Sequence, residues 1–230
     1  MKDGYIELRY SFRSALMCGA EFRCIEEHST GIYLRDPITD RIDLIGDMRF
    51  TIININHAVE SGVFDYWVFD NISGVLADNL AEIVDFETEM LNERILAHYS
   101  PCMLLLNIVF IDEIYLKPEY RGHFIGAKVI KDAIVHFSGG ASLFVIQPIP
   151  MQFYNSDCGL AERDELIRLG SDIDESTKRL TKYFECMGFE SIEGIPELLF
   201  YSPHFVNERL ETIDLDEDVL DMEWWKNMGD

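Results

Sequence analysis

The sequence predicts a mixed α/β fold of the α+β kind, on three observations. Alternating apolar and polar residues dominate the first 60 positions, which is typical of strands with one buried face. Apolar residues spaced three and four apart between about 73 and 97 indicate helices. From residue 103 onwards, almost wholly apolar segments alternate with amphipathic ones, as in buried strands that pack against helices.

The first half of the chain is expected to form strands followed by helices. The segments with strand patterns are residues 5–12, 21–27, 31–35, 42–45 and 47–57. Residues 36–40 read Asp-Pro-Ile-Thr-Asp, which is typical of a turn. One or two helices are then expected over about residues 73–97.

The second half is expected to alternate strands and helices. Residues 103–110 suit a strand buried on both faces, and residues 111–116 extend it until Pro118 ends it. A helix follows over about 124–137 and ends at Gly139-Gly140. The other expected elements are a strand at 141–147, an irregular insertion at 151–172, a helix at 176–186 capped by Asp174 or Ser176, and strands at 189–192 and 198–201.

A chain of 230 residues fits one large domain with an extension. The domain is expected over residues 1–202, and an acidic tail over 203–230 follows it. From residue 207 the tail has nine acidic and two basic side chains. Trp224 and Trp225 are expected to dock on the body of the protein or on a partner.

The composition argues against several classes of protein. A net charge of −23 would repel nucleic acid and attract a cationic substrate such as an amine, although it equally suits solubility. No apolar run reaches the roughly 18 residues that span a membrane, and no signal peptide is seen, so a cytoplasmic protein is expected. The five cysteines are scattered and the six histidines lack ligand spacing, so no metal is expected.

The segment 117–131 carries the strongest indication of a binding site. It is expected to run from a strand through a short turn into a helix, and the start of a helix offers free N–H groups and a positive dipole end. Such a place binds phosphate well. Gly122 and Gly126 let the backbone approach an anion closely. The segment holds four basic residues and one acidic residue in an otherwise acidic chain.

This segment also resembles a known family. Residues 114–127, Ile-Tyr-Leu-Lys-Pro-Glu-Tyr-Arg-Gly-His-Phe-Ile-Gly-Ala, look like the coenzyme A signature of the GNAT N-acetyltransferase superfamily. The family pattern is Arg/Gln-x-x-Gly-x-Gly/Ala: Arg121 matches the first position, Gly126 matches the last, and Phe124 replaces the middle glycine. Residues 182–189 are similar to the family's closing Phe-Tyr-Glu-Lys-x-Gly-Phe. The resemblance covers a coenzyme-binding core over about 103–201, whereas residues 1–100 diverge.

The resemblance implies a GNAT-like fold: a mixed, mostly antiparallel central sheet with a splayed strand pair, flanked by helices. The strand ending at Leu116 would splay from the strand at 141–147. The implied function is an N-acetyltransferase, an acyltransferase that moves an acetyl group from acetyl-CoA to an amine by direct attack. The acceptor would be a small amine or a protein amino group. No metal takes part, and the oligomeric state, monomer or homodimer, is left open.

The resemblance also assigns residues to the coenzyme. The backbone of Ile114, Tyr115 and Leu116 would hold the pantetheine arm and the thioester. The pyrophosphate would be held by the N–H groups of a run of seven residues: Arg121, Gly122, His123, Phe124, Ile125, Gly126 and Ala127. His123 would either contact a phosphate or be an exposed loop histidine.

Two carboxylates are candidates for the general base, because they interrupt an apolar strand. Strand alternation predicts that Asp112 and Glu113 face opposite ways, and Glu113 is favoured because Asp112 shares a face with Ile114 and Leu116.

The family's general acid is the tyrosine of the closing motif. Phe184 stands at that position here, and Tyr183 precedes it by one residue. Tyr183 is the candidate acid from this motif, with Tyr154 and Tyr201 as alternatives from elsewhere in the chain; water is a further alternative.

A second hypothesis is a catalytically weak or inactive GNAT-fold protein that works by binding, through its acidic surface and tail. Phe124, Phe184 and Thr177 stand at three family positions that usually hold glycine, tyrosine and asparagine. This hypothesis predicts coenzyme A binding, or none, without turnover.

Overall fold

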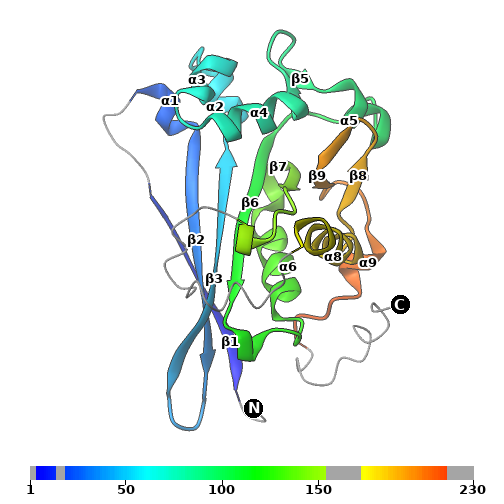
Figure 1. Ribbon diagram of the computed structural model, residues 1–230. Helices are drawn as coiled ribbons and strands as arrows, with labels where there is room; N and C mark the ends of the chain where they lie inside the picture. The colour runs from blue at the N-terminus through cyan, green and yellow to red at the C-terminus, as the bar shows by residue number, and fades with distance from the viewer. Residues whose placement is uncertain (1–3, 14–18, 154–171, 217–230) are drawn as a thin grey trace.

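The computed structural model describes residues 4–13, 19–153 and 172–216, and it has the predicted mixed α/β architecture (Figure 1). A seven-stranded sheet has the order β1-β2-β3-β6-β7-β9-β8. Neighbouring strands are antiparallel except for β6 and β7, which are parallel. The strands of this sheet are β1 (Tyr5–Arg13), β2 (Ile25–Arg35), β3 (Ile42–Ile53), β6 (Asn107–Leu116), β7 (Ala141–Ile146), β8 (Glu190–Ile192) and β9 (Ile195–Tyr201).

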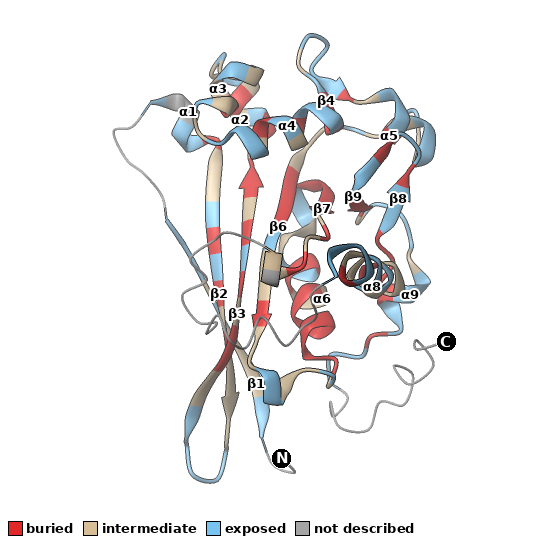
Figure 2. Ribbon diagram, viewed as in Figure 1, coloured by how far each residue is buried: buried red, intermediate tan, exposed pale blue. Residues whose placement is uncertain are grey.

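Helices pack on both faces of this sheet and build two cores. Along β6, Val109 and Ile111 face a core shared with α6 (Ile125–Phe137) and α8 (Ile173–Cys186). Ile108 and Phe110 face the other way, into a second core. That core is completed by α2 (Ile55–Glu60), α3 (Tyr66–Asp70), α4 (Gly74–Ile83) and α5 (Glu93–His98). Residues 108–111 of β6 are all buried, because both faces of the strand are covered there (Figure 2).

The start of the acidic tail packs on the first core. The short helix α9 (Glu208–Glu211) places Leu210 in this core, and Ile213 follows it there. The Lys131 ammonium of α6 donates to the backbone carbonyl of Ile213. Lys131 therefore holds Ile213, near the start of the tail, against α6. Trp224 and Trp225, predicted to dock, lie outside the described residues.

Several predictions for the first half of the chain were wrong in detail. The candidate strand at 21–27 is split, because α1 (Ala20–Arg23) precedes β2. The predicted strand at 47–57 stops at Ile53, where Asn54 caps α2 by accepting a hydrogen bond from the His57 N–H. Helices α2 and α3 were missed because each is too short to show a helical repeat. The predicted helical region at 73–97 is two helices, α4 and α5, separated by a hairpin of β4 (Val84–Asp85) and β5 (Met90–Leu91).

The second half follows the predicted order with shifted boundaries. β6 begins at Asn107 rather than 103, because the Ser142 hydroxyl takes the place of a strand partner for residues 104–106. The chain turns through η1 (Pro118–Tyr120) into α6, and η2 (Ser138–Gly140) ends that helix. Helix α8 begins earlier than predicted, capped by Asp172 and not by Asp174 or Ser176. After η3 (Met151–Phe153), most of the predicted insertion lies outside the described residues.

Candidate functional site

The separation of β6 from β7 creates the first candidate site. The two strands pair from Asn107–Ala141 to Ile111–Ile146. Beyond that point β7 ends, while β6 continues to Leu116 paired with β3. A cleft of about 380 Å³ opens beside this continuation of β6. It therefore lies where a parallel strand pair comes apart.

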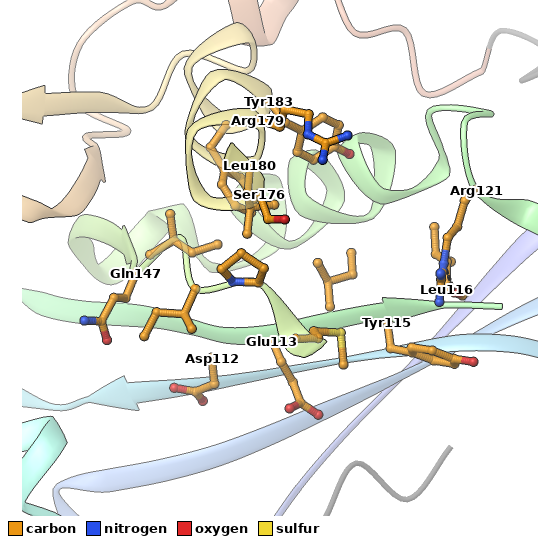
Figure 3. Close-up of a pocket in the computed structure, with 16 residues that line it drawn as sticks. Asp112, Glu113, Tyr115, Leu116, Arg121, Gln147, Ser176, Arg179, Leu180 and Tyr183 are labelled. Carbon is orange, nitrogen blue, oxygen red and sulfur yellow. Dashed lines mark hydrogen bonds between the residues drawn. The ribbon is translucent and has the colours of Figure 1, made fainter. Parts of the chain in front are cut away.

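The first cleft has walls from three parts of the fold (Figure 3). One wall is β6, another is the segment that leaves β7, and the third is α8. Apolar groups provide most of its surface, which suits an extended, weakly polar ligand arm. The lining residues of β6 are Asp112, Glu113, Ile114, Tyr115 and Leu116; those of the exit of β7 are Ile146, Gln147, Ile149, Pro150 and Met151; those of α8 are Ser176, Arg179, Leu180, Tyr183 and Phe184.

A second cleft, of about 460 Å³, surrounds the start of α6. It shares Leu116, Arg121, Arg179 and Tyr183 with the first cleft, so the two adjoin. Its other lining residues are Gly122, Phe124, Ile125, Gly126 and Lys182. The two clefts together lead from the exposed edge of β6 to the first turn of a helix.

Phe124 adopts the backbone conformation that glycine would have at the start of α6. Its φ is 64°, in the left-handed region, which costs a non-glycine residue on the order of 1–3 kcal/mol. The residue is 6% exposed and belongs to the core between the sheet and α6. Core packing therefore holds the strained backbone. Because α6 begins at Ile125, the N–H groups of its first turn have no partner within the helix.

Cations from two elements flank this first turn. The Arg121 Nε donates to the Leu116 carbonyl oxygen at 2.7 Å, and its guanidinium lies 5.5 Å from the centre of the Tyr115 ring. Helix α8 adds Arg179 and Lys182 to the second cleft. Arg179 has an exposed ion pair with Glu175 at 3.8 Å, which contributes little at a surface.

Sequence reasoning missed the two cations of α8. Arg179, Lys182 and Tyr183 are three and four residues apart, a spacing that places them on one helix face. That spacing was the available signal, but it gains meaning only once α8 is known to face α6. Of the predicted phosphate ligands, His123 is half-buried and is not among the described residues that line either cleft.

Asp112 and Glu113 point to the same face of the sheet, so the prediction of opposite faces was wrong. Arg49 of β3 pairs with Glu113, and the next residue, Phe50, pairs with Ile111. Asp112 is thus the extra residue of a β-bulge, which breaks the alternation. Glu113 accepts a hydrogen bond from the Arg49 Nε at 2.5 Å, and Asp112 accepts one from the Thr51 hydroxyl at 2.7 Å. In Figure 3 both carboxylates point away from α8.

The two carboxylates differ in their electrostatics. Desolvation raises the pKa of Asp112 to about 6, against the opposing effects of the Thr51 hydrogen bond and the Arg49 charge. Asp112 is an exposed residue that lines the first cleft, and its carboxylate has the Thr51 hydroxyl as a hydrogen-bond donor. Glu113 has a side chain 11% exposed and is held by Arg49. A carboxylate with a pKa near neutrality suits a general base, so Asp112 fits that role better than the predicted Glu113.

The candidate acids lie in different places. Tyr183 lines both clefts, with its hydroxyl against the first turn of α6. Phe184 is 2% exposed and is part of the core under α8. Tyr201 packs against Phe144 and Phe189 and is not among the residues that line either cleft. The third candidate, Tyr154, lies outside the described residues.

Two comparisons with known proteins find no match. A scan against models of protein families finds no match for this chain, and a search among curated proteins finds none either. Within the part of the chain that the structure describes, no three His, Cys, Asp or Glu side chains gather as metal ligands would. In the same part, every helix is too short or too polar to cross a membrane. The two clefts therefore carry the functional assignment.

We expect Asp112→Asn to stabilise the protein at neutral pH. The folded-state pKa of about 6 lies above the ordinary value near 3.9, so protonated Asp112 favours folding below pH 4 and that contribution is lost as pH rises through 6. Asparagine is neutral throughout and still accepts from Thr51. Urea unfolding at pH 7.5 should show a gain on the order of 1 kcal/mol after solvent screening, shrinking towards zero at pH 4. A gain independent of pH would contradict the raised pKa.

Proposed function

We propose that this protein is an N-acetyltransferase of the GNAT type, which transfers the acetyl group of acetyl-CoA to an amine. One observation carries the proposal: a mostly apolar cleft beside a diverging strand adjoins a second cleft at a cation-flanked helix start. Acetyl-CoA has the matching form, a long thioester arm joined to a diphosphate. The proposal also agrees with the resemblance of residues 114–127 and 182–189 to that superfamily.

The pantetheine arm would lie along β6 in the first cleft. Past Ile111, β3 is the one described strand that pairs with β6, so the edge towards β7 offers backbone donors and acceptors to a ligand. An extended amide-containing arm can pair with such an edge as an added strand does. Ile114 and Leu116 supply apolar contacts on that wall.

The diphosphate would lie in the second cleft. The first-turn N–H groups of α6 and the positive end of its dipole favour an anion there. Arg121, Arg179 and Lys182 add positive charge from two sides. In a chain with a net charge of −23, this local excess of cations is a specific feature of the cleft.

The reaction would proceed by direct attack of an amine on the thioester. The new N–C bond forms, the C–S bond breaks, and coenzyme A leaves as a thiolate. Asp112, ionised above pH 6, takes the proton that the amine loses. The thiolate can leave without a protein acid because thiols ionise near pH 8.5. Water can then protonate the thiolate of coenzyme A. Asp112 and Glu113 also favour a cationic acceptor, a small amine or a protein amino group.

A second candidate function is coenzyme binding without catalysis. Two observations favour it. Phe184 places an apolar ring where the family has its acid, and burial in the core fixes it there. The Tyr183 hydroxyl is held against the start of α6 rather than offered freely to the cleft. This candidate predicts acetyl-CoA binding with no amine-dependent turnover.

Binding of acetyl-CoA should depend on the cation face of α8. Arg179→Glu places a negative charge beside the diphosphate, and isothermal titration should show affinity falling about tenfold. Lys178→Glu is the matched control: it makes the same charge change one residue away on the exposed side of α8, outside both clefts. It should change affinity less than twofold. Equal losses in both variants would contradict the phosphate assignment, and no binding of acetyl-CoA at millimolar concentration would refute the proposed function.

Turnover should depend on pH through Asp112. With an amine acceptor, kcat/KM for acetyl transfer should rise about tenfold per pH unit up to pH 6 and then level, because the base must be ionised. Asp112→Asn should lower kcat by about 100-fold or more and remove this limb. Glu113→Gln should keep the limb near pH 6. If Glu113→Gln removes the pH dependence near pH 6 and Asp112→Asn keeps it, Glu113 is the base. Binding of acetyl-CoA without turnover against a panel of amines would favour coenzyme binding without catalysis.

A further inference from the structure

Tyr183 occupies the junction of the two clefts. Its ring lines both of them, and Figure 3 shows it on the α8 side, across from the carboxylates of β6. Its hydroxyl touches the first turn of α6 so closely that a Cβ added to Gly126 would lie 2.9 Å from the hydroxyl oxygen. A side chain at position 126 would therefore force the Tyr183 hydroxyl to shift.

The hydroxyl oxygen accepts a hydrogen bond from the Ala127 N–H. Helix α6 starts after Phe124, whose side chain makes no cap hydrogen bond. Tyr183 thus satisfies one of the first-turn donors from a different helix, as a capping side chain would. Because the oxygen accepts a hydrogen bond from the Ala127 N–H, its own O–H remains available to donate to a further acceptor.

The hydroxyl keeps its proton across the working pH range. Burial raises the pKa of Tyr183 well above its ordinary value near 10, and the Ala127 hydrogen bond only partly opposes this. A phenol of this kind is a persistent hydrogen-bond donor. It is a poor general acid, because an efficient acid has a pKa near the operating pH.

We propose that Tyr183 is a phosphate-binding donor: it accepts a hydrogen bond from the Ala127 N–H and donates one from its own O–H to an oxygen of a bound organic diphosphate. The inference rests on the proposed coenzyme cleft and replaces the sequence-based assignment of Tyr183 as the general acid. The hydroxyl extends the donor set of the α6 first turn into the junction. Arg121 and Arg179, which line the same junction, supply the charge that draws the diphosphate there.

The test compares Tyr183→Phe with the wild type by isothermal titration against three ligands. Acetyl-CoA carries both the arm and the diphosphate, ADP carries a diphosphate without the arm, and S-acetylpantetheine carries the arm alone. A lost donor to a charged acceptor should weaken acetyl-CoA and ADP binding about tenfold and leave S-acetylpantetheine unchanged. In acetyl transfer, the weaker binding should appear as a higher KM for acetyl-CoA.

The matched control is Tyr120→Phe, which removes a hydroxyl from a partly buried tyrosine outside both clefts. It should leave all three affinities unchanged. Both substitutions keep the aromatic ring, and a thermal melt of each variant checks that the fold is retained.

Three results for the Tyr183→Phe variant would overturn the inference about Tyr183. If Tyr183→Phe binds ADP as tightly as the wild type, the hydroxyl is not a donor to the diphosphate. If the variant binds ADP more tightly, the hydroxyl competes with the phosphate for the Ala127 N–H. A lower kcat with unchanged affinity for acetyl-CoA would mean that Tyr183 acts as the general acid. If the wild type binds ADP and acetyl-CoA but transfers no acetyl group, the transferase proposal fails while the Tyr183 comparison still decides this inference. If the wild type binds none of the three ligands, both proposals fail.

Discussion

The candidate site depends on the pairing of β6, which has two neighbouring strands over its first half and one over its second half. From Ile108 to Ile111 it pairs on both sides, with β7 and β3. From there to Leu116 the pairing with β3 continues and fixes the backbone, while the opposite edge is left to the cleft. Backbone polar groups need partners wherever water is excluded. A strand that is rigid on one edge and open on the other therefore offers a preformed surface for an extended ligand.

Charge is distributed along the same path. The bulge at Asp112 turns two consecutive carboxylates towards β3, where Thr51 and Arg49 bind them. At the other end, Arg121 and the cations of α8 gather around the start of α6. The arrangement separates negative charge at one end of the clefts from positive charge at the other. A ligand with an anionic diphosphate and a reacting group that receives an amine would align with that separation.

The main elements could be predicted because their patterns are long and regular. The apolar run of β6, the turn at Pro118 and the amphipathic pattern of α6 all appear in the sequence in the order found. The helices α2 and α3 could not be found, since five or six residues show too little of a helical repeat.

The site was predictable in part for a similar reason. Local chain order predicted the turn and helix start at 121–127, but the bulge at Asp112 depends on register with β3, which a single strand does not reveal. Arg179 and Lys182 become relevant only through the packing of α8 against α6. In the sequence, Phe124 departs from the family pattern, which has a glycine there. In the structure, its burial in the core lets Phe124 adopt the left-handed backbone conformation that glycine favours.

The most direct test of the central claim is a crystal structure of the protein with acetyl-CoA bound. The predicted result has the pantetheine arm beside residues 112–116 and the diphosphate within hydrogen-bonding distance of the α6 first turn and the Tyr183 hydroxyl. A coenzyme bound at any other surface, or clefts that stay empty at saturating acetyl-CoA, would contradict the account.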